Sequence, residues 1–290
     1  MARLQSFRID QDTAGQRLDR AAGIFLPLLS RSYIQKLCES GKIMINGAMA
    51  KAGYRLKASD VLSIDYDESE LDAIPAIDLP ILYEDDDCIV INKPAGVLTH
   101  SKGAFSPEAT VSTFMRQHVN GISGNRAGIV HRLDRATSGV IICAKHPAAL
   151  SWLQKQFSQR KVIKTYMAIV SGHVEPQHAV IDMPIERNPK HPQTFRVGSQ
   201  GKPSVTEYRV VKEAGTVSML ELKPKTGRTH QLRVHLASVG HPIVGDVLYG
   251  GQAGERLFLH ALSLEITLPN RERKIFTAVL PDEFSRTMET

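Results

Sequence analysis

Residues 131–139 read His131-Arg132-Leu133-Asp134-Arg135-Ala136-Thr137-Ser138-Gly139, a polar run between two apolar segments. Ile129-Val130 precedes the run and Val140-Ile141-Ile142-Cys143 follows it, and apolar flanks of this kind predict buried strand. The run therefore lies where a strand opens into a loop. A lone acid in such a loop is usually a turn residue or a helix cap. Asp134, however, stands close to two arginines, and a neighbouring guanidinium favours and orients a charged carboxylate.

Composition sets the broad class of the protein. The chain has 290 residues, 42% of them hydrophobic, with a net charge of +6 and a pI near 9.2. This length can form one large domain or two unequal ones, and the positive charge favours a polyanionic partner. The three cysteines form no CxxC pair, so neither a disulfide framework nor a zinc ribbon is expected. No signal peptide or membrane span is evident, so we expect a soluble, reduced, cytoplasmic protein without a membrane partner.

Charge is distributed unevenly along the first 87 residues. Segment 17–57 is rich in Lys and Arg and has only two acids, Asp19 and Glu39, whereas segment 58–87 contains no Lys or Arg and 11 acids. Pro75 and Pro80 interrupt this acidic stretch. Such a change from a basic to an acidic segment marks a domain boundary. We therefore predict a small basic domain over residues 1–72, a linker over 73–80 and a larger domain over 81–290.

The small domain is expected to contain two helices and a short hairpin. One helix is predicted over residues 18–26, and a second over 31–40 with Ser30 as its cap. Strands are predicted over 43–45 and 61–64, with Asn46-Gly47 as a hairpin turn. The basic residues of this domain are equally consistent with an RNA-docking face and with a solvated surface.

A resemblance favours the docking face. The segments Arg17–Ala21, Ser30–Ser32, Gln35–Leu37 and Ile45–Gly47 resemble the αL-type RNA-binding fold first known from a small-subunit ribosomal protein. Ala58-Ser59 stands where that family usually has a glycine, so the resemblance predicts the fold here but not the shape of this loop. The resemblance implies RNA contacts by the following residues: Arg17, Arg20, Arg31, Lys36, Lys42 and Lys51.

The larger domain shows more strands than helices. Strand-like runs occur at residues 88–92, 140–144, 165–170, 206–211 and 217–222, and helical stripes at 111–119, 150–157 and 229–239. The two types do not alternate regularly, which favours an α+β fold with a mixed, mainly antiparallel sheet over a doubly wound one. The small domain before it adds a minor α/β unit.

Three further polar runs could carry chemistry. Tyr166 in Lys164-Thr165-Tyr166 lies on a predicted strand, where a tyrosine usually serves packing. Arg228 stands where a glycine turn enters the helix over 229–239, and a cation there opposes the helix dipole unless it has an anionic partner or points away. Lys93 in Asn92–Gly96 could contact a phosphate, or it could belong to the scaffold or the surface. We favour a scaffold or surface role over a phosphate contact.

Motifs of other enzyme classes are missing from the sequence. It contains no GxxxxGK[ST] or GxGxxG loop, no GxSxG elbow and no HExxH. His230 and His235 are five residues apart, one more than the spacing that places two metal ligands on one helical face. We therefore expect neither a nucleotide cofactor nor a metal.

The runs of the larger domain together resemble the RluA-type pseudouridine synthases. The resemblance is carried by His131–Asp134 with Thr137–Gly139, then Lys164–Tyr166, Gly201–Thr206, Gly227–His235 and His241–Asp246. A preceding αL-type domain is similar to the RluC and RluD branch, which modifies large-subunit (23S) ribosomal RNA. The resemblance implies an isomerase that needs no cofactor, acts as a monomer and has RNA, not DNA, as its partner.

The resemblance also implies roles for individual residues. Asp134 matches the catalytic aspartate, and Arg228 would pair with it. Tyr166 would stack on the target uracil, and Leu232 would form a wall of the base pocket. Arg132 would fill the space left by the flipped base, so Arg132 and Asp134 should point the same way from an extended chain.

Two other functions remain open at this stage. One is a non-catalytic RNA-binding factor in ribosome assembly, which predicts loss of Asp134, Tyr166 or Arg228, although all three are present. The other is a hydrolase acting on a nucleoside glycosidic bond, because a carboxylate and a stacking tyrosine also suit that chemistry. A hydrolase would release free uracil from RNA, whereas a binding factor would leave the RNA unchanged.

Overall fold

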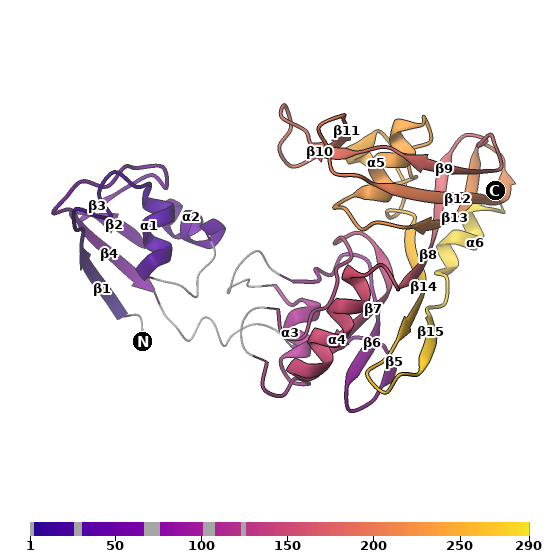
Figure 1. Ribbon diagram of the computed structural model, residues 1–290. Helices are drawn as coiled ribbons and strands as arrows, with labels where there is room; N and C mark the ends of the chain where they lie inside the picture. The colour runs from indigo at the N-terminus through magenta and orange to yellow at the C-terminus, as the bar shows by residue number, and fades with distance from the viewer. Residues whose placement is uncertain (1–2, 26–30, 67–75, 101–107, 123–125, 290) are drawn as a thin grey trace. The chain divides into compact units, whose positions relative to one another are not determined.

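The computed structural model describes residues 3–25, 31–66, 76–100, 108–122 and 126–289 (Figure 1). The chain divides into two compact units. The first comprises residues up to Ile77 with the short segments His100–Phe114 and Ser123–Ala127, and the second comprises the rest of the chain. The change of unit at Ile77 falls within the predicted linker 73–80, of which residues 73–75 lie outside the described ranges.

The first unit packs two helices on a small antiparallel sheet. The helices are α1 (Leu18–Phe25) and α2 (Arg31–Glu39), and the strand order is β1-β4-β2-β3. The strands are β1 (Arg3–Arg8), β2 (Ile43–Ile45), β3 (Ala48–Met49) and β4 (Val61–Tyr66). Both predicted helices and both predicted strands are confirmed, with α2 one residue shorter than expected. β1 and β3 were not predicted. Leu26 and the predicted cap Ser30 lie outside the described residues.

The core of this unit follows from the helical stripes. Its buried apolar side chains come from α1, α2 and the inner face of the sheet: Leu18, Ala21, Ala22, Ile34, Leu37, Ile43, Ile45, Leu62 and Ile64. Asn46 and Gly47 both have positive φ, 52° and 77°, which confirms the predicted hairpin turn. Ser59 has φ 73°, so it adopts the left-handed conformation for which the family's usual glycine is suited.

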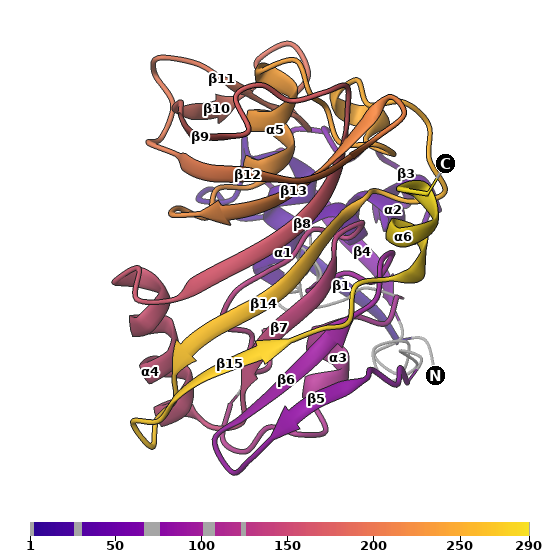
Figure 2. The same cartoon turned by 90° about the vertical axis from the view of Figure 1, so that its right-hand side faces the viewer.

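A nine-stranded sheet dominates the second unit (Figure 2). Its order is β5-β6-β7-β14-β8-β13-β12-β9, with β15 paired to β14, and all neighbours are antiparallel except β7 and β14. The mixed, mainly antiparallel α+β prediction is confirmed. The strands are β5 (Ile81–Glu84), β6 (Cys88–Lys93), β7 (Ser138–Ala144), β8 (Ile163–Ser171), β9 (His178–Asp182), β12 (Val205–Ala214), β13 (Val217–Pro224), β14 (Leu259–Thr267) and β15 (Arg273–Thr277).

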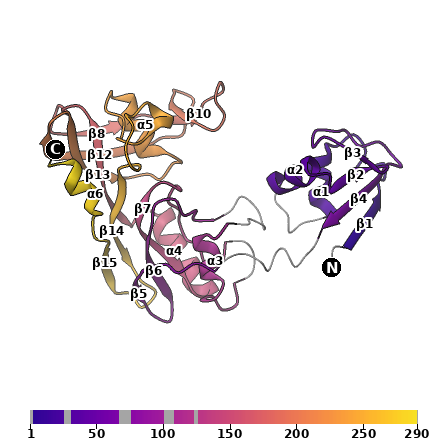
Figure 3. The ribbon, with the colours of Figure 1, turned by 180° about the vertical axis from the view of Figure 1, so that it is seen from behind.

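Helices and a hairpin complete the chain (Figures 1 and 3). A separate two-stranded hairpin joins β10 (Ile185–Arg187) to β11 (Phe195–Val197). The helices are α3 (Val111–Met115), α4 (Pro147–Ser158), α5 (Gln231–Ser238), the 3-10 turn η2 (Val247–Tyr249) and α6 (Asp282–Thr287). α3 ends four residues before the predicted stripe does. The helices of the described ranges are too short or too polar to cross a lipid bilayer.

Two apolar clusters hold the sheet to its helices. Leu232 and Leu236 of α5 pack with Ile169 and Leu220 of β8 and β13, and Phe284 of α6 joins the same cluster. The second cluster packs α4 against β6, β7 and β14 through the following residues: Val90, Val140, Ile142, Ala149, Leu153, Leu264 and Ile266.

The parallel pairing of β7 with β14 requires a glycine. Gly139 lies opposite Ala261, and its φ is 112°. A Cβ at this position would lie 2.2 Å from the Ala261 carbonyl oxygen, far inside van der Waals contact. Gly139 therefore allows β7 and β14 to approach, and this pairing anchors the end of the loop that carries residues 131–137.

Candidate active site

The loop before β7 carries Asp134. Burial alternates along it: Arg132 is exposed, Leu133 is buried and Asp134 is half-buried. The Thr99 hydroxyl fixes the middle residue, because it accepts from the Leu133 N–H at 3.1 Å and donates to the Leu133 carbonyl at 2.8 Å. This alternation is the one expected for Arg132 and Asp134 on one face of an extended chain.

A buried lysine supports the other end of this loop. The Lys93 side chain is fully buried, and its Nζ donates to the carbonyls of Pro94 (2.9 Å), Val97 (2.8 Å) and Arg135 (3.2 Å). Burial lowers the pKa of Lys93 to about 7, although the Asp134 charge acts in the opposite direction. Of the roles considered for Lys93, the structure therefore supports the scaffold role, and the side chain lies neither on the surface nor where a phosphate could reach it.

His131 anchors the start of the loop. Its ring stacks on Phe157 with centroids 4.5 Å apart, and its Nε2 accepts a hydrogen bond from the Ile142 N–H at 3.1 Å. Burial lowers the pKa of His131 to about 3. The imidazole is therefore neutral at physiological pH, and its ring proton is on Nδ1 because Nε2 is an acceptor.

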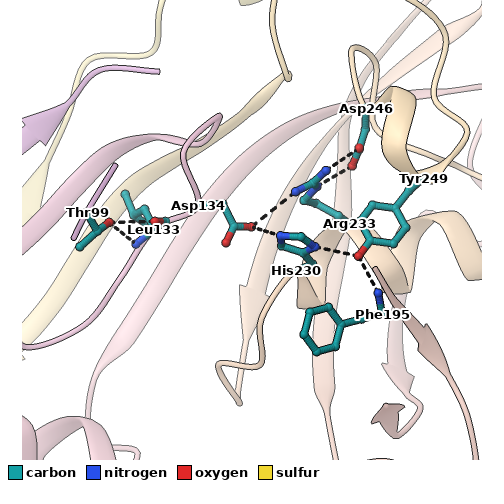
Figure 4. A network of polar contacts seen from close by, with 8 residues as sticks. All are labelled: Thr99, Leu133, Asp134, Phe195, His230, Arg233, Asp246 and Tyr249. Atoms are coloured by element: carbon teal, nitrogen blue, oxygen red, sulfur yellow. Dashed lines mark hydrogen bonds and ion pairs between the residues drawn. The ribbon is translucent and has the colours of Figure 1, made fainter. Parts of the chain in front are cut away.

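Two nitrogen-bearing side chains of the 230–233 segment face Asp134 (Figure 4). His230 Nε2 and Arg233 Nη1 each lie 3.8 Å from Asp134 Oδ2. Arg233 is itself held by Asp246, with Nε–Oδ2 and Nη2–Oδ1 distances of 2.7 Å, and both side chains are buried. Its guanidinium also lies over the Tyr249 ring, 4.9 Å from the centroid.

The predicted pairing of Arg228 with Asp134 is wrong in this structure. Arg228 Nε donates to the Pro203 carbonyl at 3.2 Å, and the arginine that faces Asp134 is Arg233. The reason lies in the helix start, since α5 begins at Gln231, two residues later than predicted. The Gln231 Oε1 accepts from the Arg228 N–H at 3.0 Å and keeps residue 228 in the preceding turn. Arg228 thus has a carbonyl oxygen as its partner in place of the predicted carboxylate.

A cavity brings the predicted substrate residues together. Its volume is about 570 Å³, within the range of sites that enclose a small molecule. Tyr166 projects from β8, where burial, with a smaller contribution from Asp134, raises the pKa of its hydroxyl. Leu232, in the first turn of α5, is buried. The cavity lining includes all five residues predicted for the catalytic and substrate-binding site: Arg132, Asp134, Tyr166, Arg228 and Leu232.

The lining is strongly cationic and contains an aromatic ring beside a carboxylate. Such a surface suits a nucleotide, whose phosphate needs positive charge and whose base needs a stacking partner. Comparison with known proteins agrees with this chemistry. Residues 87–238 match the family model for RNA pseudouridylate synthase, and residues 16–62 match that for the S4 domain. The chain belongs to the RNA pseudouridylate synthase family.

Named relatives extend this match to most of the chain. It is 35% identical over 297 residues to "Ribosomal large subunit pseudouridine synthase D" of Nitrosomonas europaea, covering 97% of this chain and 86% of that protein. It is 33% identical to "Ribosomal large subunit pseudouridine synthase C" of Vibrio cholerae, covering 94% and 91%. Among solved structures, "Human RNA Pseudouridylate Synthase Domain Containing 1" superposes with a TM-score of 0.60 at 32% identity, covering 74% of this chain and 88% of that chain. The RluA-type resemblance is confirmed, and the chain is an RNA pseudouridine synthase.

In the S4 domain of this synthase, two predicted RNA-binding arginines are organised by one acid. Asp19 is buried and receives paired hydrogen bonds from both Arg17 and Arg31, with a further one from Gln35 at 2.9 Å. These donors, Arg17 first, hold the pKa of Asp19 well below its usual range. The Arg17 and Arg31 side chains remain 46% and 58% exposed, so each keeps a face open to solvent.

The other predicted RNA-binding residues of the domain do not share this arrangement. Arg20, Lys36 and Lys51 are exposed, and Lys42 is half-buried. The predicted set thus lies where a polyanion can reach it, and Arg17 and Arg31 share the buried Asp19 as a partner.

Sequence reasoning missed several residues of the synthase site. Arg233 and His230 lie in the Gly227–His235 run, and Asp246 ends the His241–Asp246 run, yet none received a role. The scaffold role of Lys93 was among the favoured interpretations, but its complete burial was not predicted. Thr99 carries no signal in one sequence, because its role depends on a loop 34 residues away.

Proposed function

We propose that the synthase isomerises specific uridines in large-subunit ribosomal RNA and that Asp134 is its catalytic group. The observation that supports this most strongly is the Asp134 carboxylate on the lining of a cavity that also contains Tyr166 and Leu232. The names of the relatives support the choice of large-subunit RNA. We further propose that residues 1–72 dock the RNA, 73–80 link the domains and 81–290 carry the chemistry.

The reaction breaks one bond and forms another within the same nucleotide. The bond from uracil N1 to the ribose C1′ breaks, the base turns, and C5 bonds to C1′. The proton leaves C5 and N1 gains one, so no atom or electron is lost overall. Asp134 supplies a negative charge to C1′ while the first bond breaks, when positive charge develops on the sugar.

Cavity residues account for the handling of the base. Tyr166 offers a ring on which the uracil can stack, and Leu232 offers an apolar wall. A uridine within a stem must first leave its stack, which costs a few kcal/mol. Arg132, exposed next to the cavity, can place its planar guanidinium in the space that the base leaves.

A tritium-release assay tests this proposal. In large-subunit RNA carrying tritium at uridine C5, isomerisation releases the label to water, because C5 loses its hydrogen. We expect Asp134→Asn to abolish release while RNA binding stays within about tenfold, because the substitution removes only a charge. Asp86→Asn, which changes an exposed acid of the same unit, is the matched control and should retain full activity.

Two results would contradict the proposal. Substantial tritium release by Asp134→Asn would remove the catalytic assignment. Free labelled uracil in place of tritiated water would show that the enzyme hydrolyses the glycosidic bond.

A further inference from the structure

A chain of polar contacts leads from the backbone of β11 to Asp134 (Figure 4). The Phe195 N–H donates to the Tyr249 hydroxyl at 3.0 Å, and this hydroxyl lies 2.7 Å from His230 Nδ1. The other ring nitrogen, Nε2, faces Asp134 Oδ2 at 3.8 Å. We propose that His230 is a positioning residue for Asp134, held by Tyr249 so that its Nε2–H is directed at the carboxylate. This inference rests on the proposed catalytic role of Asp134.

The direction of the hydrogen bonds follows from the first donor. A backbone N–H can only donate, so the Tyr249 oxygen accepts from Phe195. The hydroxyl proton then needs an acceptor, and His230 Nδ1 lies 2.7 Å away. Because Nδ1 accepts, the proton of the neutral imidazole is on Nε2. A donor therefore faces the acceptor-only carboxylate of Asp134.

The imidazole is held in place by its backbone and by its neighbours. His230 has φ 57° and ψ 17°, a left-handed conformation that is uncommon for a residue with a side chain. Such conformations persist only where the surroundings enforce them. The rings of Phe195 and Tyr249 each meet the imidazole edge-on, with centroids 5.6 Å away. His230 thus has little freedom to turn Nε2 away from Asp134.

The charges around His230 favour a neutral donor. The groups that act on it are the carboxylates of Asp134 and Asp246 and the guanidiniums of Arg132 and Arg233. Burial is the largest effect and lowers the pKa of His230 below its usual value, despite the two carboxylates. A neutral Nε2–H orients a carboxylate without cancelling its charge.

Arg233 complements this arrangement. Its Nε and Nη2 are committed to Asp246, and only Nη1 faces Asp134. Both contacts to Asp134 are about 1 Å longer than a hydrogen bond, a gap that a side-chain rotation can close. Asp134 is therefore aimed from one side by a donor and a cation, and it is not locked into a tight ion pair that would oppose its approach to C1′.

Two substitutions of His230 separate positioning from a structural role. The amide nitrogen of His230→Gln reaches the place of Nε2, so the donor to Asp134 is kept. The amide of His230→Asn reaches only the place of Nδ1, so the contact to Tyr249 is kept and the donor to Asp134 is lost. Asn also tolerates the left-handed conformation well. His178→Asn, at an exposed histidine of β9, is the matched control.

Single-turnover tritium release and RNA affinity are measured for each variant alongside Asp134→Asn. We expect His230→Asn to slow turnover about 10–100-fold, by analogy with the loss of groups that orient metal ligands in enzymes. RNA affinity should change less than threefold, and His230→Gln should recover to within about fivefold of the parent rate. Tyr249→Phe, which leaves the imidazole tautomer free, should slow turnover about tenfold with unchanged affinity.

The outcomes distinguish this inference from the proposed function. Full turnover by His230→Asn, or equal losses in the Asn and Gln variants, would overturn the positioning role while Asp134→Asn remains inactive. Activity in Asp134→Asn would instead overturn the proposed function. Slow turnover by His230→Asn with recovery in His230→Gln supports the inference.

Discussion

Replacing Asp246 by Asn tests whether the ion pair behind the active site is as buried as the structure shows. Arg233 and Asp246 are joined by two 2.7 Å contacts, and their side chains are 10% and 1% exposed. Asn has the same shape as Asp but no charge. The substitution therefore leaves the Arg233 guanidinium buried beside a neutral amide.

The expected loss of stability in Asp246→Asn depends on the groups that remain near Arg233. Removing one partner of a buried ion pair costs about 3–5 kcal/mol. The oxygen of the new amide would still accept one hydrogen bond, and Asp134 at 3.8 Å supplies part of the lost charge. We therefore expect the lower end, a loss of about 3 kcal/mol in the free energy of unfolding of the second unit.

The chain offers a reporter for this unit alone. Trp152 is its single tryptophan and lies on α4, where the indole donates to the Thr267 carbonyl. Urea unfolding followed by tryptophan fluorescence thus reports on the second unit within the full-length protein. Arg233→Met and the double variant Arg233→Met/Asp246→Asn complete a double-mutant cycle.

The double-mutant cycle distinguishes a buried, interacting Arg233–Asp246 pair from one that contributes little to stability. A buried pair predicts that the double variant is about 3 kcal/mol more stable than the sum of the single losses, since neither charge is then left alone. A loss below about 1 kcal/mol in Asp246→Asn, or losses that add within about 0.5 kcal/mol, would refute the buried pair.

Three further predictions use the same fluorescence measurement. Gly139→Ala places a Cβ 2.2 Å from the Ala261 carbonyl oxygen and should lower the free energy of unfolding by more than about 4 kcal/mol. Gly215→Ala, at a glycine with open space around it, should lower it by about 1 kcal/mol, and similar losses in the two variants would contradict the close approach of β7 and β14. Lys93→Met should lower the free energy of unfolding by about 2–4 kcal/mol and slow tritium release, because three carbonyls lose their donor. An unchanged urea midpoint would show that Lys93 does not stabilise the loop that carries Asp134. Burial lowers the pKa of His131 to about 3, so the unfolded state binds more protons between pH 3 and about 6.5 and stability falls as pH drops through that range. His131→Gln should therefore lose less stability than the parent between pH 7 and pH 5, and equal losses would show that His131 does not control this range.

The fold class could be predicted because local patterns carry it. The apolar runs of β6, β7, β8 and β13 and the stripes of α4 and α5 are visible in sequence, and so is the loop that contains Asp134. β14 was missed, although it lies at the centre of the sheet. Its pairing with β7 joins residues more than a hundred positions apart, and no local pattern encodes such a contact.

The partner of Asp134 shows a similar limit. Arg228 lies in the turn before α5, whereas Arg233 lies in the first turn of the helix, so the two side chains have different partners. The choice between them depends on where α5 begins. That start is set by the left-handed His230 and by hydrogen bonds of the Gln231 side chain, which hydrophobic periodicity does not reveal. Resemblance placed all five residues on one cavity, but it did not identify their contacts.

The central position of β14 affects the order in which the enzyme folds during its synthesis. The strand lies between β7, which follows the Asp134 loop, and β8, which carries Tyr166. During synthesis the chain leaves the ribosome from its N-terminus, and domains fold in that order. The S4 domain is complete early, but the two halves of the large sheet stay unjoined until residues 259–267 have emerged. A nascent chain can therefore engage RNA well before it can modify a uridine.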